Sequence, residues 1–313
     1  MAASLNEVNF LFVVGAARSG TTYVTDVLDE YFDYGMSPEG HFVLQIANKL
    51  KQYGPLSIAE NMTHLLEDVR QSSTLSIIRE QWPVERRFDV TLEQLRENLL
   101  ESSFAGVVYS VFKCIAARLR RRNIGSKNPQ YTTCLPMLEG LFPGRAKYLN
   151  VIRDGRDVAL STMRMPWGQK SAYACAKSWS RYIDLAMAFE QQVGPQRFMN
   201  IRYESFVEDP VPCIERLETF LGYNLSHDRR AAFLDAASSN RLSNNFGKWK
   251  SDLGARDRVR YEAVAGHNLR RMNYEVECAS PSIGILEKAG FEIHDFGRAA
   301  YHTLRQYVKN RSA

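Results

Sequence analysis

Residues 10–23 read FLFVVGAARSGTTY and join an apolar run to a glycine-rich turn and then to residues with helical spacing. The unbroken apolar run from Phe10 to Val14 is typical of a buried parallel strand. Beyond Gly20, apolar side chains recur every three or four positions, which predicts an amphipathic helix. The unpaired amides and the positive dipole end of that helix point back at the turn. The stretch therefore predicts an anion-binding loop.

Five consecutive residues surround the expected anion: Arg18, Ser19, Gly20, Thr21 and Thr22. They supply a guanidinium group, three hydroxyls and the turn that opens the helix. The spacing is close to the GxxxxGK[ST] loop of nucleotide hydrolases, but Thr21 stands where that loop has its lysine. This substitution argues against ATP or GTP hydrolysis and leaves a phosphate cradle whose charge is met by Arg18.

A second cluster follows another apolar run, AKYLNVI at 146–152, which also predicts a buried strand. It continues into RDGRD and then into a helical segment. Arg153 lies at the end of the strand and Ser161 about two turns along the helix, so both could face one ligand at the carboxyl edge of a sheet. An arginine with a hydroxyl suits a phosphate group. Alternatively, RDGRD is a turn held by its own salt bridges.

Together the two clusters suggest a nucleotide with phosphates at two separated places, one of them off the 5′ chain. Four segments then match, in order and spacing along residues 9–275, the sulfotransferases that use 3′-phosphoadenosine 5′-phosphosulfate (PAPS). They are RSGTT at 18–22, RDGRDVALS at 153–161, IRYESFVEDP at 201–210 and FGKWK at 246–250. The first position of RSGTT is an arginine. In this the segment is more similar to the loop of the tyrosylprotein and bacterial or Golgi-type carbohydrate enzymes than to that of the cytosolic phenol and steroid enzymes.

This resemblance implies how the donor is held. Arg18 to Thr22 would hold the 5′-phosphosulfate, Arg153 and Ser161 the 3′-phosphate, and 3′,5′-ADP would be the product. Tyr203, after the apolar stretch RFMNI, offers a ring for the adenine. Alternatively, Tyr203 is a core residue.

Sulfuryl transfer also needs a base for the acceptor hydroxyl. Glu39 and His41 come where the next helix is expected to begin, beside the phosphate loop. Glu39 lies twenty-one positions after Arg18, where the resemblance implies the catalytic glutamate, and His41 is the second choice. Alternatively, Glu39 is an acid stabilised by a helix dipole, and His41 a packing or capping residue.

Lys127, in GSKNPQY, is expected at the end of a short strand. The resemblance implies that its ammonium group, with Arg18, stabilises the transferring sulfuryl group. The alternative is that Lys127 belongs to one solvated basic patch with the arginines at 118–122, which follow a predicted helix.

The loop RLSNNFGKWK, with a bend at Gly247, is suited to folding over a bound nucleotide. Lys248 and, with a looser match, Ser243 are its candidate contacts. For the acceptor, the candidate lining residues are Trp82, Met163, Met165, Pro166 and Trp167. Sugar, tyrosine, phenol and lipid hydroxyls all stay open.

The predicted fold is a P-loop-type, three-layer α/β/α domain spanning all 313 residues. Strand candidates at 9–14, 125–127, 146–152 and 197–201 are separated by helical stretches, which predicts a central parallel sheet covered on both faces. Helical spacing at about 57–105 predicts a helical insert, and about 278–313 a C-terminal extension. A nucleotide kinase would share this fold, and a non-catalytic nucleotide-binding module would share both phosphate clusters.

Composition narrows the setting of the protein. The net charge of +5 and the pI near 8.9 suit an anionic donor, and they would also suit an anionic acceptor. No nucleic-acid-binding motif accompanies the charge, so nucleic acid is not an expected partner. Neither a signal segment nor a membrane-spanning apolar run is found, so we expect a cytoplasmic protein. The five cysteines include no CxxC pair and predict buried free thiols. No metal is expected, and the oligomeric state stays open.

Overall fold

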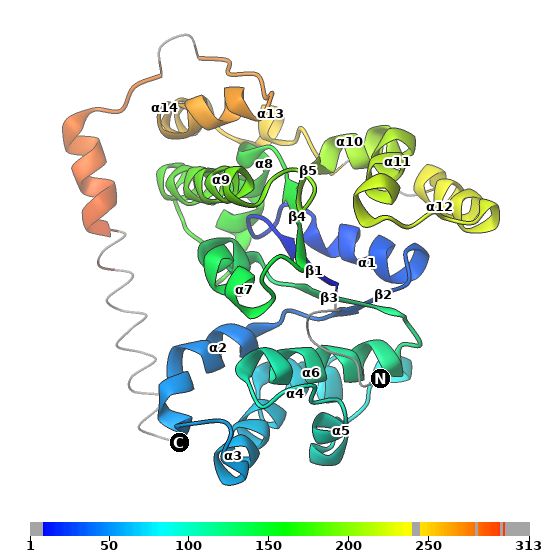
Figure 1. Ribbon diagram of the computed structural model, residues 1–313. Helices are drawn as coiled ribbons and strands as arrows, with labels where there is room; N and C mark the ends of the chain where they lie inside the picture. The colour runs from blue at the N-terminus through cyan, green and yellow to red at the C-terminus, as the bar shows by residue number, and fades with distance from the viewer. Residues whose placement is uncertain (1–8, 240–244, 279–280, 295–296, 298–313) are drawn as a thin grey trace. The chain divides into compact units, whose positions relative to one another are not determined.

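A computed structural model describes residues 9–239, 245–278, 281–294 and 297 (Figure 1). The chain divides into two compact units. The first comprises the described residues of Met1–Ile152 and Leu185–Ser243, and the second those of Arg153–Asp184 and Asn244–Ala313. A single domain over the whole chain stays a prediction.

The first unit is built on a parallel sheet with the strand order β2-β3-β1-β4-β5. Its strands are β1 (Phe10–Val14), β2 (Tyr34–Ser37), β3 (Asn123–Lys127), β4 (Ala146–Ile152) and β5 (Phe198–Arg202). The four predicted strands are confirmed. Strand β2 was not predicted, because the four residues YGMS are too short a run to carry a strand signal.

Helices cover both faces of this sheet, as the three-layer prediction requires (Figure 1). On one face, the Phe10 ring lies 5.4 Å from the ring of Phe112, which belongs to α6 (Phe104–Arg118). On the other face lies α1 (Thr21–Tyr31), where the Tyr23 ring packs against Phe206. Successive side chains of a strand point to opposite faces, so the continuous apolar run of β1 fills both layers.

In the order of the chain, the remaining helices of the first unit are α2 (His41–Lys49), η2 (Leu50–Tyr53), α3 (Ala59–Arg70), α4 (Ser73–Glu80), η3 (Val84–Arg86), α5 (Leu92–Glu97), η4 (Pro129–Cys134), α7 (Leu135–Leu141), α10 (Tyr203–Glu208), α11 (Pro210–Leu221) and α12 (His227–Ser239). Residues 57–105, all of them described, contain helices and no strand, although their status as an insert stays a prediction.

The described residues of the second unit form helices joined by turns and loops, without a strand. Its helices are α8 (Gly155–Arg164), α13 (Trp249–Asp252), α14 (Ala255–Arg271), a helix at 285–294 and the first part of α9 (Ala172–Val193), which continues into the first unit. Leu160, Trp249 and Leu253 form a small core, against which Met163 packs. Most of the predicted C-terminal extension lies outside the described residues.

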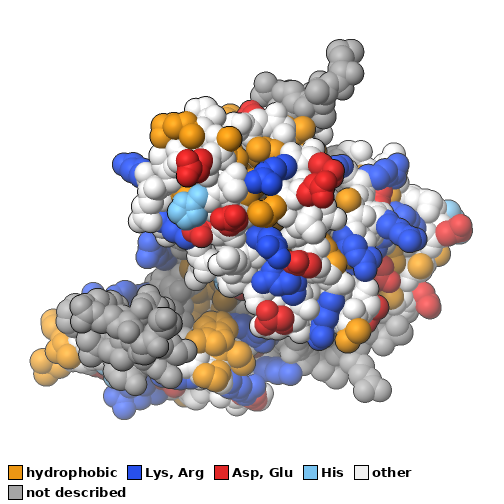
Figure 2. Space-filling view, turned by 90° about the horizontal axis from the view of Figure 1, so that it is seen from below, with side chains coloured by type: hydrophobic (Ala, Val, Ile, Leu, Met, Phe, Trp, Pro, Cys, Tyr) orange, Lys and Arg blue, Asp and Glu red, His pale blue; other side chains and the backbone are white. Residues whose placement is uncertain are grey.

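In the basic cluster at the end of α6, Arg118, Arg120 and Arg122 are exposed, as a solvated patch requires, whereas Lys127 is buried and does not belong to it. Two of the arginines also make ion pairs. Arg121 Nε lies 3.0 Å from Asp29 Oδ1, and Arg122 Nε lies 2.5 Å from Asp33 Oδ2. These ion pairs tie the end of α6 to α1 and its C-terminal loop. Figure 2 shows Lys and Arg interspersed with Asp and Glu over the face seen from below, so the net positive charge does not gather into one patch there.

All five cysteines are free thiols, as predicted. Cys114, Cys175 and Cys213 are buried, whereas Cys134 and Cys278 are half-buried, so the predicted burial is right for three of them. Within the described ranges, no helix has the length and apolar character needed to cross a membrane.

Candidate functional site

The loop between β1 and α1 has the backbone of an anion cradle. Gly15, Arg18 and Gly20 all have positive φ angles, of 135°, 70° and 92°. The Gly15 amide donates to Thr132 Oγ1 at 2.9 Å, which fixes the start of the loop. The first turn of α1 receives no side-chain cap from Gly20, so its amide groups point into the loop as donors. Helix amides of this kind are what phosphate-binding loops present to their ligand.

Ser19 provides a direct test of whether the loop fits an anion. Its side chain is 1% exposed, and its hydroxyl has no hydrogen-bond partner among the described residues. A buried hydroxyl without a partner costs about 1–3 kcal/mol. A phosphate or sulfate group in the loop would satisfy this donor, so the residues present fit the predicted ligand.

Tyr203 packs against this same loop. It is buried at the start of α10, and a Cβ added to Gly20 would lie 2.2 Å from its ring. The Tyr203 ring therefore fixes the position of Gly20, and only a glycine allows the approach. Its predicted contact with adenine stays a prediction.

Three predicted catalytic residues meet at the carboxyl edge of β2 and β3. Parallel pairing places Ser37 opposite Ser126, so Glu39, two residues beyond β2, lies beside Lys127 at the end of β3. Lys127 Nζ lies 3.2 Å from Glu39 Oε1, and His41 Nε2 lies 3.0 Å from Glu39 Oε2. The Glu39 side chain is 40% exposed, and the Lys127 side chain is 10% exposed.

The hydrogen bonds from His41 and Lys127, with the charge of Lys127, lower the pKa of Glu39 from 4.5 to about 2. Asn128 determines which ring nitrogen of His41 carries the proton. Its Oδ1 accepts from the Gln130 amide at 2.9 Å, so its NH₂ group faces His41 Nδ1 at 3.2 Å. Nδ1 is then an acceptor, and Nε2 carries the proton that is donated to Glu39.

Two buried residues that the sequence analysis did not identify hold the backbone around Glu39. Thr74 of α4 donates from Oγ1 to the Glu39 carbonyl and accepts from the Phe42 amide, both at 3.2 Å. The Tyr131 hydroxyl donates to the Gly40 carbonyl at 2.8 Å. Both come from distant segments, and their sequence context carried no signal. For Asn128, the Asn-Pro pair that caps η4 was a usable signal.

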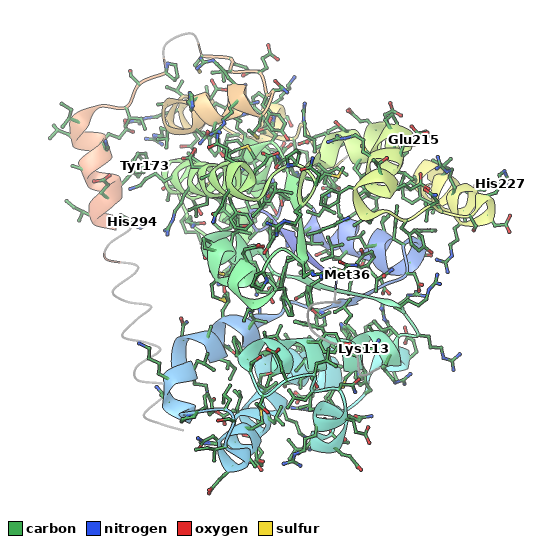
Figure 3. All side chains as sticks on the ribbon, viewed as in Figure 1. Met36, Lys113, Tyr173, Glu215, His227 and His294 are labelled. Atoms are coloured by element: carbon green, nitrogen blue, oxygen red, sulfur yellow. The ribbon has the colours of Figure 1, made fainter. Side chains whose placement is uncertain are left out.

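A cavity of about 290 Å³ adjoins these residues within the first unit. One wall is the stripe Thr22, Asp26 and Asp29, which helical spacing places on one face of α1. Its lining comprises Thr22, Thr25, Asp26, Asp29, Met36, Ser37, Pro38, Glu39, His41, Ile77, Trp82, Arg86 and Lys127. Met36 of β2 is labelled in Figure 3. The cavity thus joins the first turn of α1 to the Glu39–Lys127 pair.

The charges in this cavity differ in how they are compensated. Asp29 is nearly buried and accepts hydrogen bonds from Arg86 and Arg121. Asp26 makes no ion pair with a described residue; although its side chain is exposed, partial desolvation by its surroundings raises its pKa. Of the predicted acceptor residues, only Trp82 lines this cavity. Met163, Met165, Pro166 and Trp167 belong to the second unit, where the Trp167 side chain is exposed.

In the second unit, the RDGRD segment contains the internal salt bridges that one interpretation of the sequence expected, and phosphate binding by Arg153 stays a prediction. Arg156 is fully buried and pairs with Asp154 at 2.8 Å and Glu262 at 2.7 Å, as expected of a turn held by salt bridges. Arg153 instead donates from Nη2 to the Asn245 carbonyl.

The other predicted nucleotide contacts divide between described and undescribed residues. Ser161 is half-buried on α8, and Lys248 is exposed just before α13. Ser243 lies outside the described residues. No group of three His, Cys, Asp or Glu side chains is placed to hold a metal ion in the described part of the chain.

Comparison with known proteins gives a consistent family. The sulfotransferase family profile matches residues 11–227. The chain is 30% identical over 118 residues to the omega-hydroxy-beta-dihydromenaquinone-9 sulfotransferase Stf3 of Mycobacterium bovis, a match that covers 33% of this chain and 29% of that protein. It is 21% identical over 327 residues to protein-tyrosine sulfotransferase A of Caenorhabditis elegans, with 96% of this chain and 77% of that protein covered.

Two solved structures share the fold. The sulfotransferase domain of the curacin biosynthetic pathway matches with a TM-score of 0.54 at 18% identity, covering 86% of this chain and 99% of that domain. The sulfotransferase domain of the Synechococcus PCC 7002 olefin synthase matches with a TM-score of 0.52 at 17% identity, covering 86% and 96%.

Proposed function

Because the chain belongs to the sulfotransferase family, we propose that it transfers a sulfuryl group from PAPS to the hydroxyl group of an acceptor. The observation that carries the proposal is the Glu39–Lys127 pair, which shares one cavity with the first turn of α1. A base, a cation and an anion-binding helix end are the three groups that this reaction needs.

The 5′-phosphosulfate of the donor is assigned to the loop between β1 and α1. Arg18, Ser19, Gly20, Thr21 and Thr22 would hold the 5′-phosphosulfate through their amides, hydroxyls and guanidinium group. In support, Ser19 has a buried hydroxyl in need of a partner, and the side chain of Arg18 is exposed at the loop. When bound, the donor supplies the sulfuryl group, and the bond between its sulfur and the 5′-phosphate oxygen breaks to leave 3′,5′-ADP.

The 3′-phosphate is assigned to Arg153, Ser161 and Lys248, with Tyr203 and Ser243 as further nucleotide contacts. Two of these residues already lie on connected segments, because Arg153 binds the Asn245 carbonyl of the loop that carries Lys248.

Glu39 is the proposed base and takes the proton of the acceptor hydroxyl as the oxygen of that hydroxyl bonds to sulfur. A carboxylate with a pKa of about 2 is a weak base, because His41 and Lys127 both donate to it. Lys127 can donate either to Glu39 or to an oxygen of the sulfuryl group. Turning its ammonium group away from Glu39 raises the basicity of the carboxylate and places positive charge on the transferring group, together with Arg18.

The acceptor is assigned to the cavity beside Glu39. The mycobacterial relative is named for a hydroxylated menaquinone and the nematode relative for protein tyrosine, so both names point to hydroxyl acceptors. The carboxylate of Asp26, which makes no ion pair with a described residue, favours an acceptor without net negative charge, whereas the overall charge of the chain suggested an anionic one. Cytoplasmic placement and the lack of a metal requirement stay predictions.

Transfer is tested with ³⁵S-labelled PAPS and a panel of sugar, phenol and tyrosine acceptors. We expect PAPS-dependent release of 3′,5′-ADP with a labelled product, and a fall of about 10²–10⁴-fold in kcat for Glu39→Gln. Binding of 3′,5′-ADP by calorimetry should survive this change. The matched control is Glu30→Gln, an exposed acid on α1 outside the cavity lining.

Three results would count against the proposal. Full activity in Glu39→Gln would remove Glu39 from the mechanism. Failure to bind 3′,5′-ADP would remove the donor. Magnesium-dependent transfer of the γ-phosphate of ATP would restore the kinase alternative, which the threonine at position 21 in place of the P-loop lysine disfavours.

A further inference from the structure

Asp157, the last residue of RDGRD, makes contacts that the proposed function does not use. It lies in the first turn of α8, yet its carboxylate accepts hydrogen bonds from two backbone amides of a segment ninety residues away. Oδ2 accepts from Gly247 N at 2.6 Å, and Oδ1 accepts from Trp249 N at 3.0 Å. Asp157 is 2% exposed. Both carboxylate oxygens are therefore committed to the loop that carries Lys248.

The neighbouring arginine completes the contact. The Arg156 guanidinium carbon lies 3.4 Å from the centre of the Trp249 ring, and Asp154 and Glu262 hold the guanidinium group in place. Trp249 is itself buried. Arg156 and Asp157 thus hold the ring and the backbone of one loop residue at the same time.

In the chain, Lys248 lies between Gly247 and Trp249, the two residues whose amides donate to Asp157. Gly247 has a φ of 72°, and an added Cβ there would meet nothing within 4 Å, so glycine is required by the backbone angle and not by space. The two hydrogen bonds fix the backbone on both sides of Lys248, while its side chain stays exposed. A long, exposed lysine on a fixed backbone loses less freedom when it binds an anion.

The charge of Asp157 also needs an explanation, because a buried carboxylate near a phosphate site would repel the ligand. Burial raises the pKa of Asp157, and the amides of Gly247 and Trp249 act in the opposite direction. The two amides donate hydrogen bonds to the carboxylate of Asp157. They therefore compensate part of its negative charge on the side of the loop that carries Lys248.

We propose that Asp157 is a positioning residue that makes the protein selective for nucleotides bearing a 3′-phosphate, by holding Lys248 through the 247–249 backbone. The inference rests on the proposed function, because it takes the 3′-phosphate as the ligand of Lys248. Asp157 does not touch the nucleotide.

The test compares binding of 3′,5′-ADP with binding of 5′-AMP, which lacks the 3′-phosphate, by calorimetry. We expect Asp157→Asn to weaken 3′,5′-ADP binding about tenfold, the scale of one charge-assisted contact, and to leave the Kd for 5′-AMP within about twofold. Asparagine keeps the shape but offers only one acceptor oxygen. Asp228→Asn, a fully exposed acid of α12, is the control.

Two further variants separate positioning from a general loss of structure. Lys248→Met should reduce the preference for 3′,5′-ADP, and adding Asp157→Asn to it should cause little further loss, because both changes act on one contact. Gly247→Ala strains the backbone that Asp157 holds while leaving the Asp157 side chain itself unchanged, so it should cause the same selective loss even if Asp157→Asn folds poorly.

Each outcome decides between the two proposals. If the wild type prefers 3′,5′-ADP but Asp157→Asn and Gly247→Ala keep that preference, the positioning role is wrong and the proposed function stands. Equal weakening of both nucleotides, or fully additive effects of Asp157→Asn and Lys248→Met, also overturns the positioning role. A wild type that binds 5′-AMP as tightly as 3′,5′-ADP overturns both proposals.

Discussion

Replacing Gly20 by alanine should destabilise the protein through one identifiable contact. The new methyl group would lie 2.2 Å from Cδ2 and 2.7 Å from Cε2 of Tyr203. Gly20 also has a φ of 92°, a region that residues with a Cβ rarely adopt. The substitution therefore combines a steric overlap with backbone strain at the phosphate loop.

The size of the effect follows from the geometry. Carbon atoms pack at about 3.5–4.0 Å, so the Tyr203 ring has to move by more than about 1 Å. It is buried and packed edge-on against Tyr23, with ring centres 6.2 Å apart. Overpacking of this kind costs about 1–3 kcal/mol, and the left-handed backbone adds about 1–2 kcal/mol. The free energy of unfolding should fall by about 2–5 kcal/mol.

Urea unfolding of wild type and Gly20→Ala measures this difference, with Gly140→Ala as the matched control. Gly140 lies in α7 without a positive φ, and an added Cβ there meets nothing within 4 Å. Alanine at that position should stabilise by about 0.5–1 kcal/mol. The same glycine-to-alanine substitution should therefore lower the free energy of unfolding at position 20 and raise it at position 140.

A double-mutant cycle isolates the overlap with the ring. Combining Gly20→Ala with Tyr203→Leu should cost about 1–3 kcal/mol less than the sum of the single variants, because the smaller side chain removes the clash. The reasoning is refuted if Gly20→Ala changes the free energy of unfolding by less than about 0.5 kcal/mol, or if the two substitutions are additive.

Three further predictions concern the same unit. Ser19→Ala removes a buried hydroxyl without a partner, so the free protein should gain about 1 kcal/mol in urea unfolding while 3′,5′-ADP binding weakens about tenfold; a loss of stability would contradict this. The pKa of Glu39 lies below its usual 4.5, at about 2, so its contribution to stability is complete above pH 4.5 and is lost as the pH falls toward 2. Unfolding of wild type and Glu39→Gln should therefore converge over that range, and a constant difference would argue against the His41 and Lys127 contacts. Thr74→Val keeps the shape of the side chain but removes two buried hydrogen bonds, so the free energy of unfolding should fall by about 1–3 kcal/mol. In the same variant, kcat should fall by a larger factor than the KM for the donor rises. An unchanged kcat would show that Thr74 does not position Glu39.

Much of the fold could be predicted because its signals are local. The run from Phe10 through Tyr23 contains a strand, a turn and the first residues of a helix, and the structure has each of them in place. The continuous apolar run of β1 and the largely apolar β4 identified the centre of a parallel sheet, since strands covered on both faces need no polar alternation. The short edge strand β2 lacks that signal and could not be predicted.

The missing strand matters because it places the candidate base. Glu39 and Lys127 are 88 residues apart, and only the pairing of β2 with β3 brings their side chains to 3.2 Å. The sequence suggested both residues singly, through family resemblance. The hydrogen bonds of Thr74 and Tyr131 around them depend on packing between distant elements, which leaves no periodic trace in the chain.

The sequence by itself determined the strand, turn and helix at residues 10–31, the parallel sheet to which they belong and the family, because local backbone preferences and apolar periodicity act within a few residues. Only the tertiary structure decided which carboxylates are paired. Asp29 pairs with two arginines, and Glu39 binds a lysine and a histidine. Asp157 accepts hydrogen bonds from two backbone amides of a distant loop. The pairing of a charge depends on distances of a few ångströms between elements far apart in the chain, and the spacing of residues along a sequence does not contain those distances.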